Sequence, residues 1–266
     1  MKNSSSWVPS VIDENRSTTE NYAKQISSRL FGKQSPYMLQ RNPVDIRPVS
    51  TIVANLCKLQ DIAWTKYAFS REALNGKFDD EQRLELTQKA IDCGTEAAEV
   101  CIAKYGTNNP VAIAKAMGLK VSYPTQPQNA GRVLFAEFCP PQEVNIFMDA
   151  INRANKLLEE PDVQETLGEI QISNILLGHE LFHMVEQEQS EEIWTKTFKI
   201  HLWSLGPIRN HSRVSVLSEI AAMSFSKRLN ALPYSPYVMD AFLVYGYSAE
   251  IASRLYEEMM HYAGEE

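Results

Sequence analysis

One short stretch of the chain, residues 178–183, carries the side chains best suited to chemistry, in the order Gly-His-Glu-Leu-Phe-His. In a helix, residues four apart lie on one face about one turn apart, so the imidazoles of His179 and His183 can reach the same ion. Zinc accepts neutral imidazole nitrogens and adds a third protein ligand and a water molecule. Glu180 lies about 100° further round such a helix, where its carboxylate can act as general base on that water. The spacing, H-E-x-x-H, is a recognised metalloprotease signature.

The residues around this motif indicate a buried helix. Apolar side chains occupy nearly every face of the segment, at Ile170, Ile172, Ile175, Leu176, Leu177, Leu181, Phe182, Met184 and Val185. A helix that is apolar all round belongs inside a domain, and polar rings buried there need partners, because unpaired buried polar groups are costly. A metal ion would supply these partners. The alternative interpretation is a structural helix with two buried, hydrogen-bonded histidines and a solvated glutamate.

Two histidines hold zinc poorly on their own, so the site needs a third protein ligand. We expect this ligand to be Glu219, which lies in the segment Leu-Ser-Glu-Ile-Ala-Ala of residues 217–222, inside a predicted buried helix. An acid in so apolar a setting needs a partner, and a metal would be one. Ala222, one turn further along the helix, leaves room for close approach. The alternative is a glutamate at the surface or in a salt bridge.

Other polar residues are weaker candidates for the same site. Glu186 shares the face of the first histidine but sits about one turn beyond the second, so a supporting role fits its position better than coordination. His201 and His211 could bind the ion, and either of them, Arg209 or a tyrosine could stabilise the developing oxyanion. A solvated acidic cluster follows the motif, at Glu188, Glu191 and Glu192.

The pattern of apolar residues predicts a mostly helical chain with a small sheet. Helices are expected at 19–30, 49–77, 79–105, 111–117, 149–160, 163–189, 215–230, 237–245 and 248–263, bounded by Gly, Pro, Asn and Asp. Strands are expected at 119–123, 132–138 and 144–148. The last of these could pair with an extended peptide if it lies at the sheet edge. Residues 190–214 hint at an extended segment with a turn at Gly206 and Pro207.

The composition is that of a soluble globular protein, with 266 residues, 44% hydrophobic and 22% charged. The net charge of −7 argues against a nucleic-acid backbone as the main partner. No apolar run approaches the length of a membrane span, and the first ten residues lack the apolar core of a signal peptide. The cysteines, Cys57, Cys93, Cys101 and Cys139, form no C-x-x-C pair. We therefore expect reduced thiols in a cytoplasmic protein.

The predicted fold class is α+β and mostly helical. We divide the chain into a polar N-terminal arm at 1–48, a helical part at 49–106 that packs on the core, and the core with the C-terminal helices at 107–266. In that core, a sheet of about three strands packs on the helix with the histidine motif.

Three segments also point to a family. They are Asn-Pro-Val-Ala-Ile-Ala-Lys-Ala-Met-Gly-Leu-Lys-Val at 109–121, the histidine motif at 178–183, and Glu-Ile-Ala-Ala-Met-Ser-Phe at 219–225. Together they resemble the ImmA/IrrE (domain of unknown function 955) metallopeptidases, over roughly residues 107–232. The resemblance implies a minimal zincin core, one Zn²⁺ held by His179, His183 and Glu219, and Glu180 as general base. Characterised members cleave helix-turn-helix repressors, which implies a protein or peptide substrate.

These observations favour a cytoplasmic zinc-dependent endopeptidase with no direct nucleic-acid or membrane partner. The chain departs from the family pattern at Phe182, Ala221 and Met223. A second hypothesis is therefore a non-catalytic regulatory or binding protein that keeps a structural metal site. A third, a zinc hydrolase acting on a non-peptide amide, shares the chemistry of the first and differs in the shape of its cleft.

Overall fold

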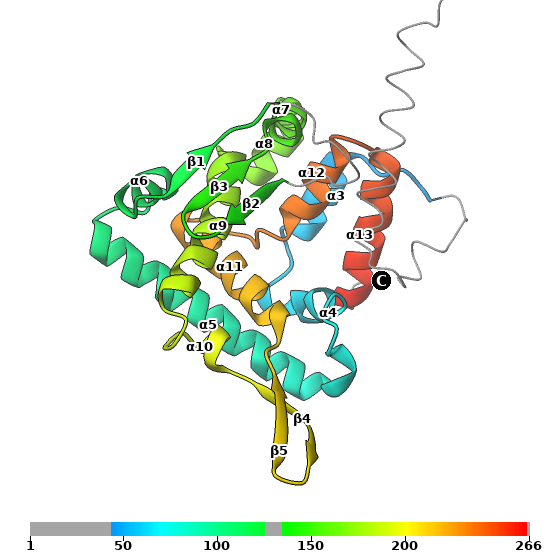
Figure 1. Cartoon of the computed structure of the whole chain (residues 1–266). Helices are drawn as coiled ribbons and strands as arrows, with labels where there is room; N and C mark the ends of the chain where they lie inside the picture. The colour runs from blue at the N-terminus through cyan, green and yellow to red at the C-terminus, as the bar shows by residue number, and fades with distance from the viewer. Residues whose placement is uncertain (1–43, 126–134, 265–266) are drawn as a thin grey trace, which may run out of the picture.

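The computed structural model describes residues 44–125 and 135–264. The helix predicted at 19–30, most of the predicted arm at 1–48 and the start of the strand predicted at 132–138 lie outside the described residues. The described chain is α+β and mostly helical, with a three-stranded and a two-stranded sheet (Figure 1), which confirms the predicted fold class. In these ranges, no helix is both long enough and apolar enough to cross a membrane.

Most of the predicted helices form close to their predicted positions. The longest, α5 (Asp80–Tyr105), begins with a capping box in which Asp79 and Gln82 each accept a hydrogen bond from the other's backbone N–H. Gly106, with φ 68°, ends it in the left-handed conformation that glycine adopts freely. The others are α6 (Pro110–Ala116), α7 (Met148–Leu157), α11 (Ser215–Leu229), α12 (Val238–Tyr245) and α13 (Ala249–Ala263).

Two of the helix predictions are wrong, because each predicted helix is divided into shorter elements in the structure. The helix expected at 49–77 divides into α3 (Val49–Leu56), the 3₁₀ turn η1 (Asp61–Trp64), α4 (Thr65–Phe69) and the 3₁₀ turn η2 (Asn75–Lys77). Gln60 is extended, with ψ 155°, and interrupts it. The helix expected at 163–189 divides into α8 (Pro161–Leu167) and α9 (Ile172–Glu188). Gly168 separates them with φ 74° and ψ −170°, a conformation open essentially to glycine alone.

The three-stranded sheet packs on α9, as predicted. Its central strand is β3 (Glu143–Ile146), with β1 (Lys120–Ser122) parallel on one side and β2 (Ala136–Cys139) antiparallel on the other. Helix α9 contacts β2 and β3. The strand expected at 144–148 does not meet the condition for pairing with a peptide, because β3 is bordered by β1 and β2 on its two sides. Among the described strands, β2 is the edge strand that contacts α9.

A hairpin, which lies between α9 and α11 in the sequence, extends away from the rest of the molecule (Figure 1). After the short helix α10 (Trp194–Thr197), strands β4 (Ile200–Leu205) and β5 (Ile208–Ser212) pair antiparallel. Gly206, with φ 59°, lies in their turn. The turn predicted at Gly206 and Pro207 is therefore confirmed, and the extended segment is confirmed from Ile200 onward. Its expected start at Trp194 is wrong, because Trp194–Thr197 is helical.

Helix α11 lies at the centre of the core, between α5 and α9. Gly94 lets α5 approach closely, because a Cβ there would lie 2.0 Å from the carbonyl oxygen of Ala221. On the other side, the ring of Phe182 lies 5.6 Å from that of Phe225, and both side chains are fully buried. Helices α3 and α4 lie beside α12 and α13, so the first and last described helices are neighbours (Figure 1). The contacts of α11 with α5 and with α9 fix the positions of α9 and α11 relative to each other.

Candidate metal centre

Helices α9 and α11 bring together the three residues expected to bind metal. His179 and His183 project from successive turns of α9, and their Nε2 atoms are 3.3 Å apart. Glu219 reaches across from α11, with Oε2 at 3.3 Å from Nε2 of His179 and Oε1 at 3.7 Å from Nε2 of His183. When one ligand atom is taken from each residue, the three atoms all lie within 4.8 Å of one another.

These separations suit a single small cation. Ligand atoms placed tetrahedrally at zinc–nitrogen and zinc–oxygen distances of about 2.0–2.1 Å lie about 3.3–3.4 Å from one another. The histidine side chains are only 16% and 19% exposed, whereas that of Glu219 is 55% exposed. The cluster is therefore enclosed on the α9 side and open on the α11 side. Two imidazoles, one carboxylate and an open side are the donor set of a catalytic zinc site.

The charges around the cluster favour a positive ion. Burial would by itself lower the pKa of His179. The hydrogen bond to Glu219 and the negative charges of Glu219 and Glu180 outweigh that effect and raise the pKa to about 9. Neutral imidazole is the form that binds metal. A divalent cation would supply the positive charge that a proton otherwise brings to this position.

Glu180 lies beside the cluster and is held by the sheet. Its side chain is nearly buried, at 9% exposure, and its Oε2 accepts a hydrogen bond from the backbone N–H of Phe138 at 2.8 Å. Phe138 belongs to the edge strand β2. The carboxylate thus lies between α9 and the sheet edge and takes no part in the three-residue cluster.

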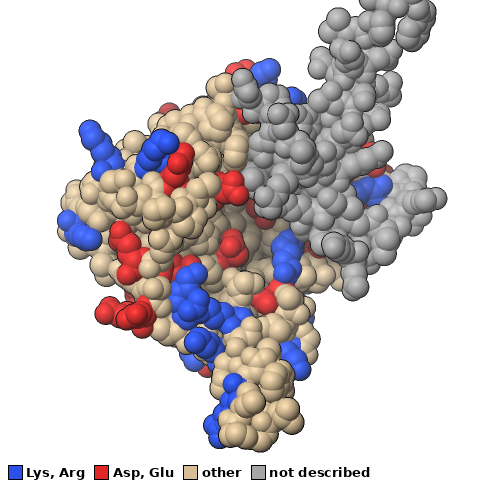
Figure 2. Space-filling view, in the orientation of Figure 1, with Lys and Arg blue, Asp and Glu red and all other residues tan. Residues whose placement is uncertain are grey.

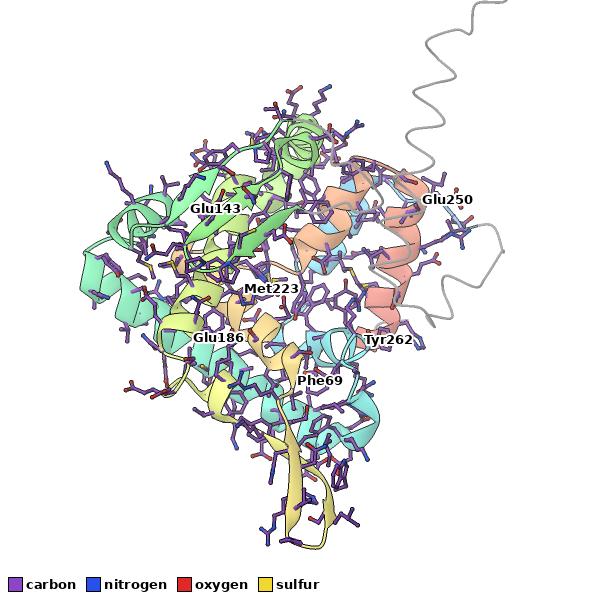
Figure 3. The ribbon with its side chains drawn as sticks, viewed as in Figure 1. Phe69, Glu143, Glu186, Met223, Glu250 and Tyr262 are labelled. Carbon is purple, nitrogen blue, oxygen red and sulfur yellow. The ribbon has the colours of Figure 1, made fainter. Side chains whose placement is uncertain are left out.

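Glu186 supports the cluster from behind, near the C-terminal end of α9 (Figure 3). Its side chain is 1% exposed, and its Oε2 accepts hydrogen bonds from Ser218 at 2.7 Å and Lys196 at 2.7 Å. The same oxygen lies 3.7 Å from Nδ1 of His183. Burial alone would raise the pKa of Glu186, but the donor groups of His183, Lys196, Thr195 and Ser218 around the carboxylate lower it to about 2. An ionised carboxylate behind one ring nitrogen would orient the other nitrogen toward a metal ion, if one is bound between the three residues.

This supporting network was only partly predictable. The supporting role expected for Glu186 agrees with its position. Lys196 and Ser218 were not foreseen, because no spacing rule links α9 to α10 and α11. The acids Glu188, Glu191 and Glu192 are exposed, in agreement with the predicted solvated cluster.

The alternative histidine candidates do not join the cluster. His201 and His211 face each other across the hairpin, with ring centroids 5.4 Å apart. His201 also lies 2.7 Å from the hydroxyl of Ser204. Arg209 lies on the same hairpin, opposite Ser204. The structure therefore gives none of these three a place beside the paired imidazoles.

The four cysteines also stay apart from the cluster. Cys57, Cys93, Cys101 and Cys139 are free thiols, and none belongs to the group of candidate metal ligands. Burial raises the pKa of Cys57 to about 12 and that of Cys101 to about 11. Thiols that remain protonated are poor metal ligands.

A cavity of about 550 Å³ opens beside the cluster. Its lining includes His183, Glu219, Phe138, Lys196 and Arg213. Figure 2 shows the hollow on this face, with acidic and basic side chains around it. The cavity is large enough for several side chains of an extended peptide, and it borders the open side of the cluster.

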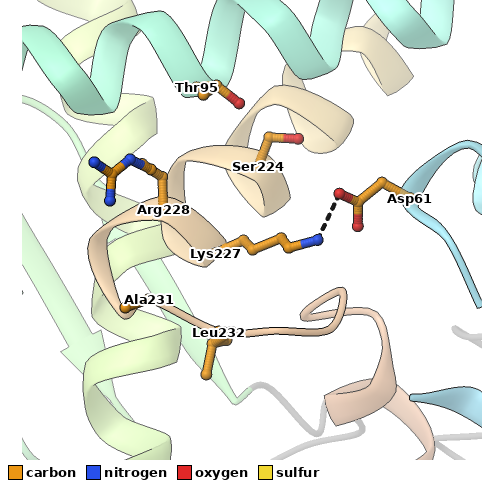
Figure 4. Close-up of a pocket in the computed structure, with 7 residues that line it drawn as sticks. All are labelled: Asp61, Thr95, Ser224, Lys227, Arg228, Ala231 and Leu232. Atoms are coloured by element: carbon orange, nitrogen blue, oxygen red, sulfur yellow. Dashed lines mark hydrogen bonds and ion pairs between the residues drawn. The ribbon is translucent and has the colours of Figure 1, made fainter. Parts of the chain in front are cut away.

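A second cavity, of about 320 Å³, lies further along α11 (Figure 4). Lys227 and Asp61 form an ion pair of 2.6 Å at its wall. None of the three clustered residues lines it. Its other charged side chain, Arg228, forms an ion pair with Glu99, so the charged groups that line this cavity already have partners.

Comparisons of the chain with protein-family models, with curated proteins and with solved structures found no match.

Proposed function

We propose that the chain is a zinc-dependent endopeptidase that hydrolyses peptide bonds of a protein substrate. The observation that carries the proposal is the close approach of His179, His183 and Glu219, whose ligand atoms lie within 4.8 Å of one another, next to the buried carboxylate of Glu180, which is not in this group. The prediction from the sequence named the same four residues. The motif fixes His179, Glu180 and His183 but says nothing about Glu219. The position of Glu219 beside the two histidines is therefore a second, separate observation in favour of the proposal.

Glu180 is the proposed general base. When bound, zinc would acidify a water molecule and polarise the scissile carbonyl. Glu180 would accept the proton of the attacking water and return it to the leaving amine. The N–H of Phe138 fixes the orientation of this carboxylate. Glu186 would hold the ring of His183 through Nδ1.

The edge of β2 that no other described strand borders is the proposed binding site for an extended substrate. In an antiparallel pair, alternate residues direct their backbone N–H and C=O groups to opposite sides. The N–H of Phe138 points to Glu180 and away from β3, so the backbone groups of Ala136 point the same way. A peptide that pairs with this edge lies along the outer side of β2, next to Glu180.

The test is cleavage of quenched fluorescent peptides of mixed sequence by zinc-loaded protein. We expect the wild type to cleave them and Glu180→Gln to be slower by about 10²–10⁴-fold, because the general base is lost. Zinc content should be unchanged in this variant. Glu188→Gln, an exposed position on the same helix, is the matched control and should cleave normally. Equal rates for Glu180→Gln and wild type would overturn the proposal, and zinc binding without cleavage would favour a non-catalytic metal protein.

A further inference from the structure

We propose that one face of the β4–β5 hairpin, together with Arg213 at the mouth of the cavity, binds an acidic segment of the protein substrate. This inference rests on the proposed function and deepens it, because it names the chemical class of the substrate. The occupant is a polypeptide segment that bears several Asp or Glu side chains.

The first observation is a separation of charge along the chain. Between Glu192 and Glu219 there is no acidic residue, although the chain as a whole carries a net charge of −7. The same stretch contains four cations, Lys196, Lys199, Arg209 and Arg213. Figure 2 shows basic side chains at the base of the hairpin and along it. A basic surface on an acidic protein marks a place where a negatively charged partner is favoured.

The second observation is that the hairpin has two different faces. Side chains alternate along a strand, so Arg209 and His211 lie on one face of β5. Their partners across the pair are Ser204 and His201, and the two histidine rings are in contact at 5.4 Å. This cationic and polar group is called the basic face below. The opposite face carries the exposed apolar side chains Trp203, Leu205 and Ile208.

The basic face leads to the candidate metal centre. Arg213 directly follows the end of β5 and lines the cavity together with His183 and Glu219. Lys196 also lines this cavity, but its ammonium is taken by Glu186 at 2.7 Å. In the described parts of the chain, Arg213, Arg209 and Lys199 form no ion pair. The cations that remain available thus run from the cavity outward along the hairpin.

This arrangement favours a polypeptide over a nucleic acid. The basic face contributes Arg209 and the cavity contributes Arg213. The lining of that cavity also includes Phe138 of the proposed peptide-binding edge and the carboxylates of Glu186 and Glu219. A phosphate backbone would meet these acids and the net negative charge of the molecule. An extended peptide with acidic side chains can pair its charges with the hairpin while its backbone follows β2. Exposed ion pairs each change a dissociation constant by about 1.5- to 5-fold, so several of them give about tenfold.

The experiment uses the full chain with Glu180→Gln, loaded with zinc, so that binding is measured without cleavage. Fluorescein-labelled peptides of one sequence carry four Glu, four Gln or four Lys, and anisotropy gives their dissociation constants at 50 and 300 mM NaCl. We expect the Glu peptide to bind about tenfold tighter than the Lys peptide at low salt, with the preference weakened at high salt. Adding Arg209→Glu and Arg213→Glu should reverse the preference.

The control variant carries Lys115→Glu and Lys156→Glu, which change the net charge equally at exposed positions away from the hairpin. Its preference should match that of the parent. Melting temperatures equal to the parent's show that each variant is folded. The proposal is overturned if the hairpin variant binds the Glu peptide as the control variant does, or if a single-stranded oligonucleotide of equal charge binds more tightly.

Failure of the two proposals can be told apart. Cleavage of peptides without any charge preference overturns the acidic docking face and leaves the peptidase in place. Binding that depends on Arg209 and Arg213, with no cleavage by the wild type, supports the docking face and contradicts the peptidase.

Discussion

Gly94→Ala tests whether the crossing of α5 and α11 positions Glu219, the proposed third metal ligand. An added Cβ would lie 2.0 Å from the carbonyl oxygen of Ala221, whereas ordinary contacts begin at 3.4 Å. The two helices would have to separate by about 1.4 Å to restore that contact. The obstacle is backbone, so no side-chain rotation relieves it. Glu219 lies two residues from Ala221 on α11 and would move with the helix.

The cost of this separation follows from two opposing effects. Overpacking of a close contact costs about 3 kcal/mol at the upper end of its usual range. Replacing glycine by alanine inside a helix returns about 1 kcal/mol. We therefore expect a net loss of about 2 kcal/mol in the free energy of unfolding, measured by urea denaturation followed by circular dichroism. The melting temperature should fall by about 4–8 °C for a chain of this size.

A second readout links this contact to the site. Isothermal titration should show weaker zinc binding by Gly94→Ala, because α11 carries Glu219 away from the paired imidazoles. Gly76→Ala is the matched control, since a Cβ there meets nothing within 4 Å, and its stability should stay within about 0.5 kcal/mol of wild type. If Gly94→Ala were as stable as this control and bound zinc equally well, the close helix crossing would not be what positions Glu219.

Three further predictions concern the core and the supporting groups. Burial raises the pKa of Glu258 from 4.5 to about 7. The folded state then holds this proton more tightly than the unfolded state, so about 3 kcal/mol of stability is lost as pH rises from about 4.5 to 7. Glu258→Gln should remove that loss, which urea midpoints at pH 5 and pH 8 would show as a smaller difference than in wild type. Glu186→Gln should raise the zinc dissociation constant by about 10–100-fold, against an unchanged value for the exposed Glu188→Gln; equal values would rule out the supporting role. Phe182→Ala, which empties a fully buried position against Phe225, should cost about 3–5 kcal/mol in urea denaturation, and a cost below 1 kcal/mol would contradict the packing.

The sequence was informative wherever the pattern was local. The histidine motif lies within one helix, and Glu219 was identified because an acid stood out in an apolar helical stretch. The capped helix at 79–105 was found for the same reason, since Asp79 and Gly106 mark its ends. Each of these inferences needs only the spacing of neighbouring residues.

The features that were missed depend on backbone conformation or on distant contacts. The apolar pattern continues across Gln60 and Gly168, so it gives no sign that the helices break there. The central position of β3 depends on pairing with strands on both sides, which the strand's own sequence does not specify. The bond from Phe138 to Glu180 joins residues 42 positions apart. Tertiary packing of this kind decides the geometry of the site and leaves no local signature.

The central claim is that His179, His183 and Glu219 hold one divalent cation between α9 and α11. The most direct measurement is the zinc content of purified protein by mass spectrometry after dialysis against a defined free-zinc concentration. We predict one zinc per chain for the wild type and for Glu180→Gln, and much less for His179→Ala and Glu219→Ala. A wild type without zinc, or a Glu219→Ala variant that retains a full equivalent, would contradict the account.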